Sequence, residues 1–222
     1  MLYLTSRKVL APSLRAVWRP TVEGTRNVPR TGGVILASNH LSFVDSIVIP
    51  ACAPRQVFFL AKADYFTGTG LKGAAMRAWM TSMGMIPVER DDTRAAQRSL
   101  EIALEVLSEG KAFGIYPEGT RSRDGRLYRG RTGVAYLALE AGVPVVPVGL
   151  QGTQDIQPVG SNRFQRAHAT VRFGEPMHFT EAYAGVPAGR ARREVTDQVM
   201  AAIHELTGQP LADGYNEHPP AQ

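Results

Sequence analysis

The sequence of 222 residues is poor in cysteine and in long hydrophobic runs. Cys52 is the only cysteine, so an intrachain disulfide is excluded, and with widely scattered histidines no structural zinc site is expected. No uninterrupted apolar run reaches the roughly 18 residues of a membrane-spanning helix. The apolar part of the N-terminus is too short and too broken for a cleavable signal peptide.

The overall composition is that of a globular protein. Hydrophobic residues make up 44% and charged residues 20% of the chain, which is long enough for one domain with a buried core. The net charge of +5 favours an anionic partner: nucleic acid, anionic lipid or a phosphorylated substrate. Few aromatic residues stand among the basic ones, and nucleic acid would need them for base stacking, so no nucleic-acid partner is predicted.

The first twenty residues have the pattern of a basic amphipathic helix. On a helical wheel the two kinds of side chain separate, with Leu10, Leu14 and Val17 on one side and Lys8, Arg15 and Arg19 on the other. This pattern is typical of a segment lying in a membrane interface, although a surface helix packed on the protein's own core would look similar. Pro12 is expected to kink or restart the helix.

Strand and helix signals alternate after about residue 30, which predicts a single α/β domain. Its central sheet should be mostly parallel or mixed and flanked by helices. Strands are expected at residues 33–38, 56–61, 85–88, 111–117, 143–150 and 169–173. Helices are expected from Asp45 and over residues 70–84, 91–110, 132–142 and 190–208. The helix over 91–110 can be capped by Asp91, Asp92 or Thr93 and ended by a left-handed Gly110, and its apolar stripe consists of Leu100, Ala103, Leu104 and Leu107. We therefore divide the chain into a membrane-associating segment (1–20), the main domain (21–208) and a Pro-, Gly- and polar-rich flexible tail (209–222).

Two expected strand exits carry unusual polar residues, and in open α/β sheets ligands bind where strands end. At the first, His40 and Asp45 are five positions apart. They meet if His40 lies in a loop and Asp45 in the first turn of the next helix, so that Asp45 orients the imidazole as a base. On spacing alone, a structural histidine beside a helix cap is favoured. Ser42 has no nucleophile-elbow sequence around it and is expected to form a turn.

The second exit is a basic loop, residues 117–131, with five arginines against two carboxylates and a net charge of +3. Gly119 allows backbone N–H groups to approach a ligand, and Thr120 and Arg121 offer hydrogen bonds to phosphate oxygens. Glu118 should pair with an arginine or accept from a substrate hydroxyl. A solvated basic loop and an anion site both remain open.

Two further cations are candidates for the same site. Arg90 closes a short strand and could join the phosphate pocket, or pair with a nearby carboxylate on the surface. Lys62 ends an apolar run and could stabilise an oxyanion or phosphate, or extend from the strand end into solvent. Taken alone, neither residue indicates a site.

Four stretches in order carry a family resemblance: "NHLSFVD", "GMIPVER", "YPEGTRS" and "VPVVPVGL". Over residues 22–176 the chain resembles the glycerophospholipid acyltransferases, specifically the bacterial 1-acylglycerol-3-phosphate acyltransferases. In the second block Pro87 and Glu89 stand where the family often has an aromatic residue and an aspartate, which bears on acceptor headgroup selectivity.

The resemblance implies that His40 is the general base and that Asp45 orients it. The hydroxyl of a lysophospholipid would attack an acyl thioester, acyl-CoA or acyl-carrier protein, directly. Arg90, Glu118, Gly119, Thr120 and Arg121 would bind the acceptor, with Lys62 in a supporting role. No metal and no cofactor beyond the acyl donor are implied.

The same resemblance implies a peripheral or monotopic enzyme on an anionic membrane surface, at the cytoplasmic face of the plasma membrane. The alternatives left open are another lysophospholipid or glycolipid acceptor, and a CoA-independent transacylase or thioesterase that uses the same His40 and Asp45.

Overall fold

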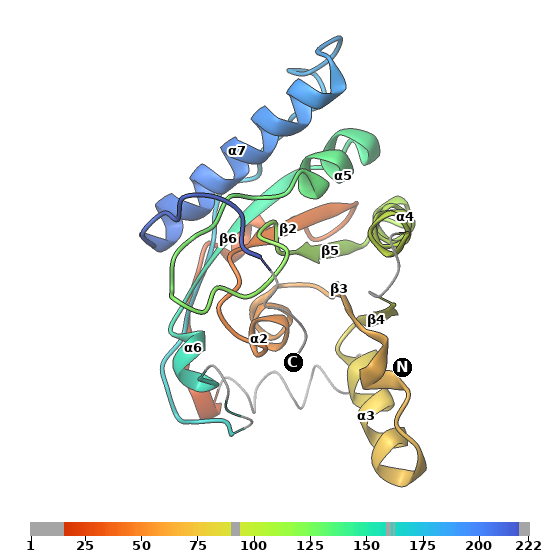
Figure 1. Ribbon diagram of the computed structural model, residues 1–222, viewed down its shortest axis with the longest axis vertical. Coiled ribbons are helices and arrows are strands. Elements are labelled where there is room, and N and C mark those ends of the chain that lie inside the picture. The colour runs from red at the N-terminus through yellow and green to blue at the C-terminus, as the bar shows by residue number, and fades with distance from the viewer. Residues whose placement is uncertain (1–15, 90–93, 159–160, 162, 218–222) are drawn as a thin grey trace.

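The computed structural model describes residues 16–89, 94–158, 161 and 163–217 (Figure 1). The strands are β1 (Thr21–Glu23), β2 (Val34–Ser38), β3 (Val57–Lys62), β4 (Met85–Val88), β5 (Ala112–Ile115), β6 (Val145–Gln151) and β7 (Thr170–Phe173). The α-helices are α2 (Asp45–Cys52), α3 (Gly70–Ser82), α4 (Ala95–Ser108), α5 (Gly133–Ala141), α6 (Thr153–Ile156) and α7 (Ala188–Thr207), and the short 3-10 helices are η1 (Thr25–Asn27) and η2 (Ala63–Phe66).

The strands form one mixed sheet in the order β1-β7-β6-β2-β5-β3-β4. Strands β4, β3, β5, β2 and β6 are parallel, whereas β7 is antiparallel to β6 and pairs in parallel with β1. The predicted α/β class and mixed sheet are confirmed. Strand β1 was not predicted, because three residues with two exposed side chains give no hydrophobic pattern.

The central strand β2 is buried along its whole length, which explains its continuous hydrophobic sequence. Because β2 pairs in parallel with β5, their carboxyl ends lie side by side at one edge of the sheet. The loop that carries His40 and the loop that begins at Tyr116 leave the sheet at this edge. The pairing of two strands therefore places the two polar sequence blocks next to each other.

Helices cover both faces of the sheet (Figure 1). Helices α4, α5 and α7 contribute to one hydrophobic core, and α2, α6 and the last turn of α3 contribute to the other. In α4 the predicted stripe packs inward, with Ala103 and Leu107 buried, and Gly110 has the expected left-handed φ of 71°. The predicted cap of this helix, Asp91, Asp92 or Thr93, lies outside the described residues.

The two ends of the chain bear on the predicted domain boundaries. Most of the predicted amphipathic segment lies outside the described residues; Trp18, near its end, is buried. Residues 209–217 belong to the segment that the composition predicts to be a flexible tail. They lie along the loop of residues 117–131, where the N–H of Leu127 donates to the carbonyl of Pro210 and the N–H of Ala212 donates to the carbonyl of Leu127. Backbone pairing of this kind has no side-chain pattern, so composition alone did not predict it.

Within the part of the chain that the structure describes, none of the helices combines the length and the hydropathy needed to cross a membrane.

Candidate active site

His40 and Asp45 meet in the loop between β2 and α2. The Nδ1 atom of His40 lies 2.8 Å from Oδ2 of Asp45, the first residue of α2. The same oxygen accepts the backbone N–H groups of Leu41 at 2.7 Å and Ser42 at 2.9 Å. Asp45 is fully buried, so these donors hold its carboxylate at one position and fold the loop around it. The predicted loop-and-helix geometry brings the pair together, and His40 lines the adjoining cavity.

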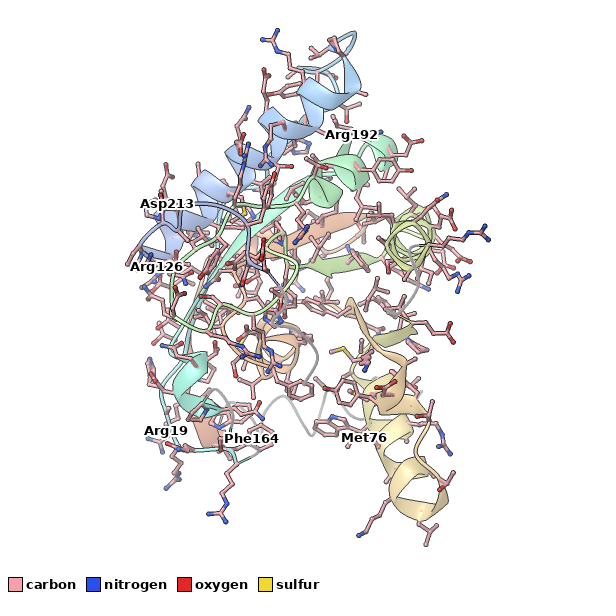
Figure 2. The ribbon with its side chains drawn as sticks, in the orientation of Figure 1. Arg19, Met76, Arg126, Phe164, Arg192 and Asp213 are labelled. Atoms are coloured by element: carbon pink, nitrogen blue, oxygen red, sulfur yellow. The ribbon has the colours of Figure 1, made fainter. Side chains whose placement is uncertain are left out.

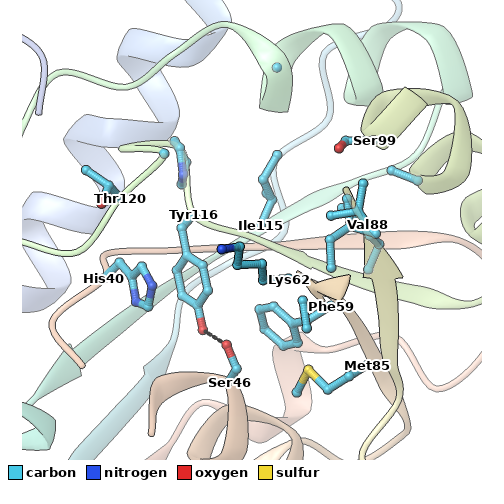
Figure 3. Close-up of a pocket in the computed structure, with 18 of the residues that line it drawn as sticks. His40, Ser46, Phe59, Lys62, Met85, Val88, Ser99, Ile115, Tyr116 and Thr120 are labelled. Atoms are coloured by element: carbon cyan, nitrogen blue, oxygen red, sulfur yellow. Dashed lines mark hydrogen bonds between the residues drawn. The ribbon is translucent and has the colours of Figure 1, made fainter. Parts of the chain in front are cut away.

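The imidazole of His40 is also held from its face. It stacks on the ring of Tyr116, with 3.8 Å between the ring centroids and 8° between their planes. The hydroxyl of Tyr116 shares a hydrogen bond of 2.8 Å with the hydroxyl of Ser46 (Figure 3). Burial, together with the charge of Asp45, raises the pKa of Tyr116 well above its ordinary value. Tyr116 is therefore a neutral phenol that fixes the orientation of the ring, and it does not act as a base.

Glu118 has a different environment from the one that the sequence indicated. Its side chain is fully buried, and its two carboxylate oxygens accept the backbone N–H groups of His40 and Tyr128, each at 3.0 Å. Burial raises the pKa of Glu118 to about 7, against the opposing effect of these two hydrogen bonds. Its partners are backbone donors and not an arginine of the described residues, and Glu118 is not among the residues that line the cavity. Glu118 instead joins the His40 loop to the basic loop.

Gly119, Thr120 and Arg121 line the cavity beside His40. Gly119 has a left-handed φ of 80°, and a Cβ atom at this position would lie 3.0 Å from Nε of Arg131. The glycine therefore permits both the sharp turn of the backbone and the close passage of the arginine above it. Together with Arg123 and Arg131, these residues give one end of the cavity a cationic wall.

The remaining candidates are placed as follows. Lys62 lines the cavity at the end of β3, and its ammonium group pairs with Asp64 at 2.6 Å. Arg90 lies outside the described residues. Ser42 is buried; its carbonyl accepts the N–H of Asp45 in a local turn, and its Oγ donates to the carbonyl of Gln157 at 3.1 Å. Among the described residues no cluster of His, Cys, Asp and Glu is arranged to hold a metal ion.

The cavity has a volume of about 860 Å³, within the usual size range of ligand sites. Figure 3 shows His40 and Thr120 on one side of it, Tyr116 between, and Phe59, Val88 and Met85 on the other. Apolar side chains from α3, α4 and α5 complete that other side, among them Met80, Leu100 and Leu137. One cavity thus joins a polar, cationic end, where the imidazole of His40 lies, to an apolar end.

Sequence reasoning missed three contributors to this site. Tyr116 is the first residue of the block "YPEGTRS", and its aromatic ring was a usable signal. Arg131 was counted in the loop charge but not singled out. Gln209, whose amide accepts from Nδ2 of Asn39 at 2.7 Å, lies 170 residues from Asn39 in sequence and gave no signal.

The fold and this arrangement define an α/β protein with a His–Asp pair at the polar end of an apolar cavity. The chain belongs to the Acyltransferase family, whose model matches residues 19–151. The predicted family resemblance is therefore confirmed.

Named relatives and a solved structure agree with this membership. The chloroplast 1-acyl-sn-glycerol-3-phosphate acyltransferase LPAT1 of Arabidopsis thaliana is 31% identical over 84% of this chain and 51% of its own length. The 1-acyl-sn-glycerol-3-phosphate acyltransferase of Bacillus subtilis is 27% identical over 83% of this chain and 86% of its own.

The crystal structure of the 1-acyl-sn-glycerophosphate acyltransferase PlsC from Thermotoga maritima superposes with a TM-score of 0.67 at 25% identity, covering 91% of this chain and 81% of that one. The chain spans about half the length of the chloroplast relatives that it matches.

Proposed function

We propose that the protein transfers an acyl group from an acyl thioester to the free hydroxyl of 1-acylglycerol-3-phosphate, giving phosphatidic acid. The observation that carries this proposal is the His40–Asp45 pair at the cationic end of a cavity whose other end is apolar. The reaction needs a base for a hydroxyl, a cationic site for a phosphate and an apolar volume for an acyl chain. The names of the relatives point to the same acceptor.

In this proposal His40 is the general base. Its Nε2 atom takes the proton of the acceptor hydroxyl while the oxygen attacks the thioester carbonyl. The tetrahedral intermediate collapses, the C–S bond breaks, and the thiolate of CoA or of the acyl carrier protein takes the proton back from the imidazolium. Asp45 holds the productive tautomer and stabilises the imidazolium. No acyl-enzyme is required, and Ser42 is committed to its hydrogen bond with Gln157.

The acceptor phosphate would bind at the cationic end of the cavity. The backbone turn at Gly119 and the side chains of Thr120 and Arg121 face this end, and arginine matches the geometry of phosphate oxygens. Arg90 and Lys62 are proposed as supporting cations on the family resemblance. Glu118 acts behind the site as the link between the two loops and does not bind the acceptor itself.

We further propose that the protein works as a peripheral enzyme on an anionic membrane, at the cytoplasmic face where thioester donors are present. Helix α3 supports this. Leu71 is 91% and Met76 46% exposed, Lys72 and Arg77 are exposed beside them, and the helix contains no acidic residue. Trp79 and Met80 of the same helix line the cavity, so contact with a bilayer at α3 would bring a lipid acceptor close to the site.

The activity is tested by offering purified protein an acyl-CoA with lysophosphatidate, lysophosphatidylglycerol or lysophosphatidylinositol, and by following thiol release and the acylated lipid separately. The proposal expects phosphatidic acid to form in step with thiol. Thiol release without an acylated lipid would identify a thioesterase. Preference for another acceptor would replace the lysophosphatidate assignment.

The membrane contact is tested by sedimentation with anionic liposomes. The variant Lys72→Glu should bind several-fold less than the wild type, while Arg190→Glu on helix α7 serves as the charge reversal of the same size. Equal losses from both variants would refute a specific role of α3.

A further inference from the structure

The C-terminal segment of residues 209–216, here called the C-terminal strap, runs along the basic loop that forms the cationic end of the cavity. Besides its two backbone bonds to Leu127, it accepts the N–H of Arg129 at the carbonyl of Gly214, at 2.8 Å. In Figure 1 the dark blue end of the chain lies beside this green loop. The strap therefore forms the outer support of a loop that has no helix or strand of its own over residues 117–131.

The strap begins with a buried link to the residue before His40. The side chain of Gln209 accepts from Nδ2 of Asn39 at 2.7 Å and donates to the carbonyl of Gly125 at 2.8 Å. Asn39 is itself fixed to β6, where it donates to the carbonyl of Leu150 and accepts its N–H. One amide thus connects the His40 loop, the basic loop and the strap.

The strap ends at two residues that contact the cationic groups directly. The ring of Tyr215 lies 5.3 Å from the guanidinium of Arg129 and 5.6 Å from that of Arg131, within the range of cation–π attraction. Asn216 accepts from Arg131 at its carbonyl at 3.3 Å and donates from its side chain to the carbonyl of Thr120 at 3.4 Å. Arg131 and Thr120 both line the cavity, and Arg131 passes directly over Gly119.

We propose that the strap is a positioning element of the acceptor site: Tyr215 and Asn216 hold Arg131 over Gly119, where it binds the phosphate of the acceptor beside Arg121. An arginine has many rotamers, and holding its side chain in the bound geometry reduces the entropy lost when the phosphate binds. The aromatic face of Tyr215 also reduces the repulsion between Arg129 and Arg131 in a loop of net charge +3. A carboxylate in its place would compete with the phosphate for these arginines. This inference rests on the proposed acceptor site.

Replacing a residue that positions Arg131 should change acceptor binding alone, whereas replacing a residue that only stabilises the fold should affect all kinetic constants. Loss of the Tyr215 ring should weaken binding of a phosphate monoester and raise the KM for lysophosphatidate, and should leave the KM for acyl-CoA and the kcat nearly unchanged. Tyr215→Phe keeps the aromatic face and loses only the oxygen that accepts a 3.3 Å hydrogen bond from Arg193, so it should rescue binding. Leu211→Ala is the matched control, because Leu211 belongs to the strap and its side chain is 63% exposed.

The experiment measures the Kd of the full-length protein for glycerol 3-phosphate by calorimetry, together with acceptor and donor kinetics. We expect Tyr215→Ala to raise this Kd and the acceptor KM about fivefold, with Tyr215→Phe and Leu211→Ala close to wild type. An unchanged Kd in Tyr215→Ala, or equal changes in all three variants, would overturn the inference. Absence of glycerol 3-phosphate binding by the wild type would overturn it together with the acceptor site. Binding that depends on Tyr215 in a protein without acyl-transfer activity would refute the proposed reaction and leave the strap assignment standing.

Discussion

The replacement of Asp45 by asparagine separates the chemical role of this carboxylate from its structural role. Three donors converge on Oδ2, whereas Oδ1 is buried and accepts no hydrogen bond from the described residues. Asparagine can therefore keep its oxygen at the three donors and place its amide nitrogen where Oδ1 stood. The loop should keep its shape, and the charge that stabilises an imidazolium on His40 is lost.

The two effects have different expected sizes. A buried amide nitrogen without a partner lowers the free energy of unfolding by about 1–3 kcal/mol, which the protein should survive as a folded chain. Loss of an oriented and charge-stabilised general base should lower kcat/KM about 10²- to 10⁴-fold, equivalent to about 3–5 kcal/mol of activation free energy. The rate effect should therefore exceed the stability effect.

The assay compares wild type and Asp45→Asn in thiol release and lipid product, beside urea unfolding of both proteins. Asp155→Asn, an exposed carboxylate at the start of α6, is the matched control. A folded Asp45→Asn protein with a kcat/KM within threefold of the wild type would refute the reasoning. A loss of activity that only tracks unfolding would refute it as well.

Three further predictions concern the loops around His40. The pKa of Glu118 is about 7 in the folded protein, above its ordinary value of 4.5. The stabilisation that comes from its protonated form is therefore complete below pH 4.5 and is lost as the pH rises to about 7. The free energy of unfolding of the wild type should therefore fall by about 3 kcal/mol over this range relative to Glu118→Gln, and parallel pH profiles in urea titrations would contradict this. Gly119→Ala and Gly185→Ala each force a left-handed alanine, at φ 80° and 79°, and should each destabilise by about 1 kcal/mol. Only Gly119→Ala, which meets Arg131, should also raise the acceptor KM; equal KM changes in both would remove the assigned role of this turn. Arg121→Ala should raise the KM about tenfold or more for lysophosphatidate and less for lysophosphatidylglycerol, and an equal loss for both acceptors would show that Arg121 does not read the phosphate monoester.

The sequence predicted the parts of this fold that depend on local pattern. The buried strand β2 is a continuous apolar run, and α4 has its stripe at helical spacing. The pairing of His40 with Asp45 also followed from local rules, because a helix that starts at Asp45 turns its first residue back toward the preceding loop. These features depend on residues within a few positions of one another.

The missed features depend on contacts between distant segments. Glu118 binds the N–H of His40, 78 residues away, and no pattern in its own loop shows that a carboxylate will be satisfied by backbone donors and not by arginine. Composition predicts a flexible tail for the strap, because its proline, glycine and polar residues form no hydrophobic pattern. Its backbone groups and Gln209 find their partners only after β2 and the basic loop have been brought together by the sheet.

The central claim is that His40 is the base of an acyl transfer to lysophosphatidate. The most direct test is the rate of phosphatidic acid formation from acyl-CoA and lysophosphatidate by wild type and His40→Ala, with the Kd for glycerol 3-phosphate measured on both proteins. Product is expected from the wild type, with a rate at least about 100-fold lower in the variant and a Kd within about twofold of the wild-type value. Phosphatidic acid formation by His40→Ala at near the wild-type rate would contradict it.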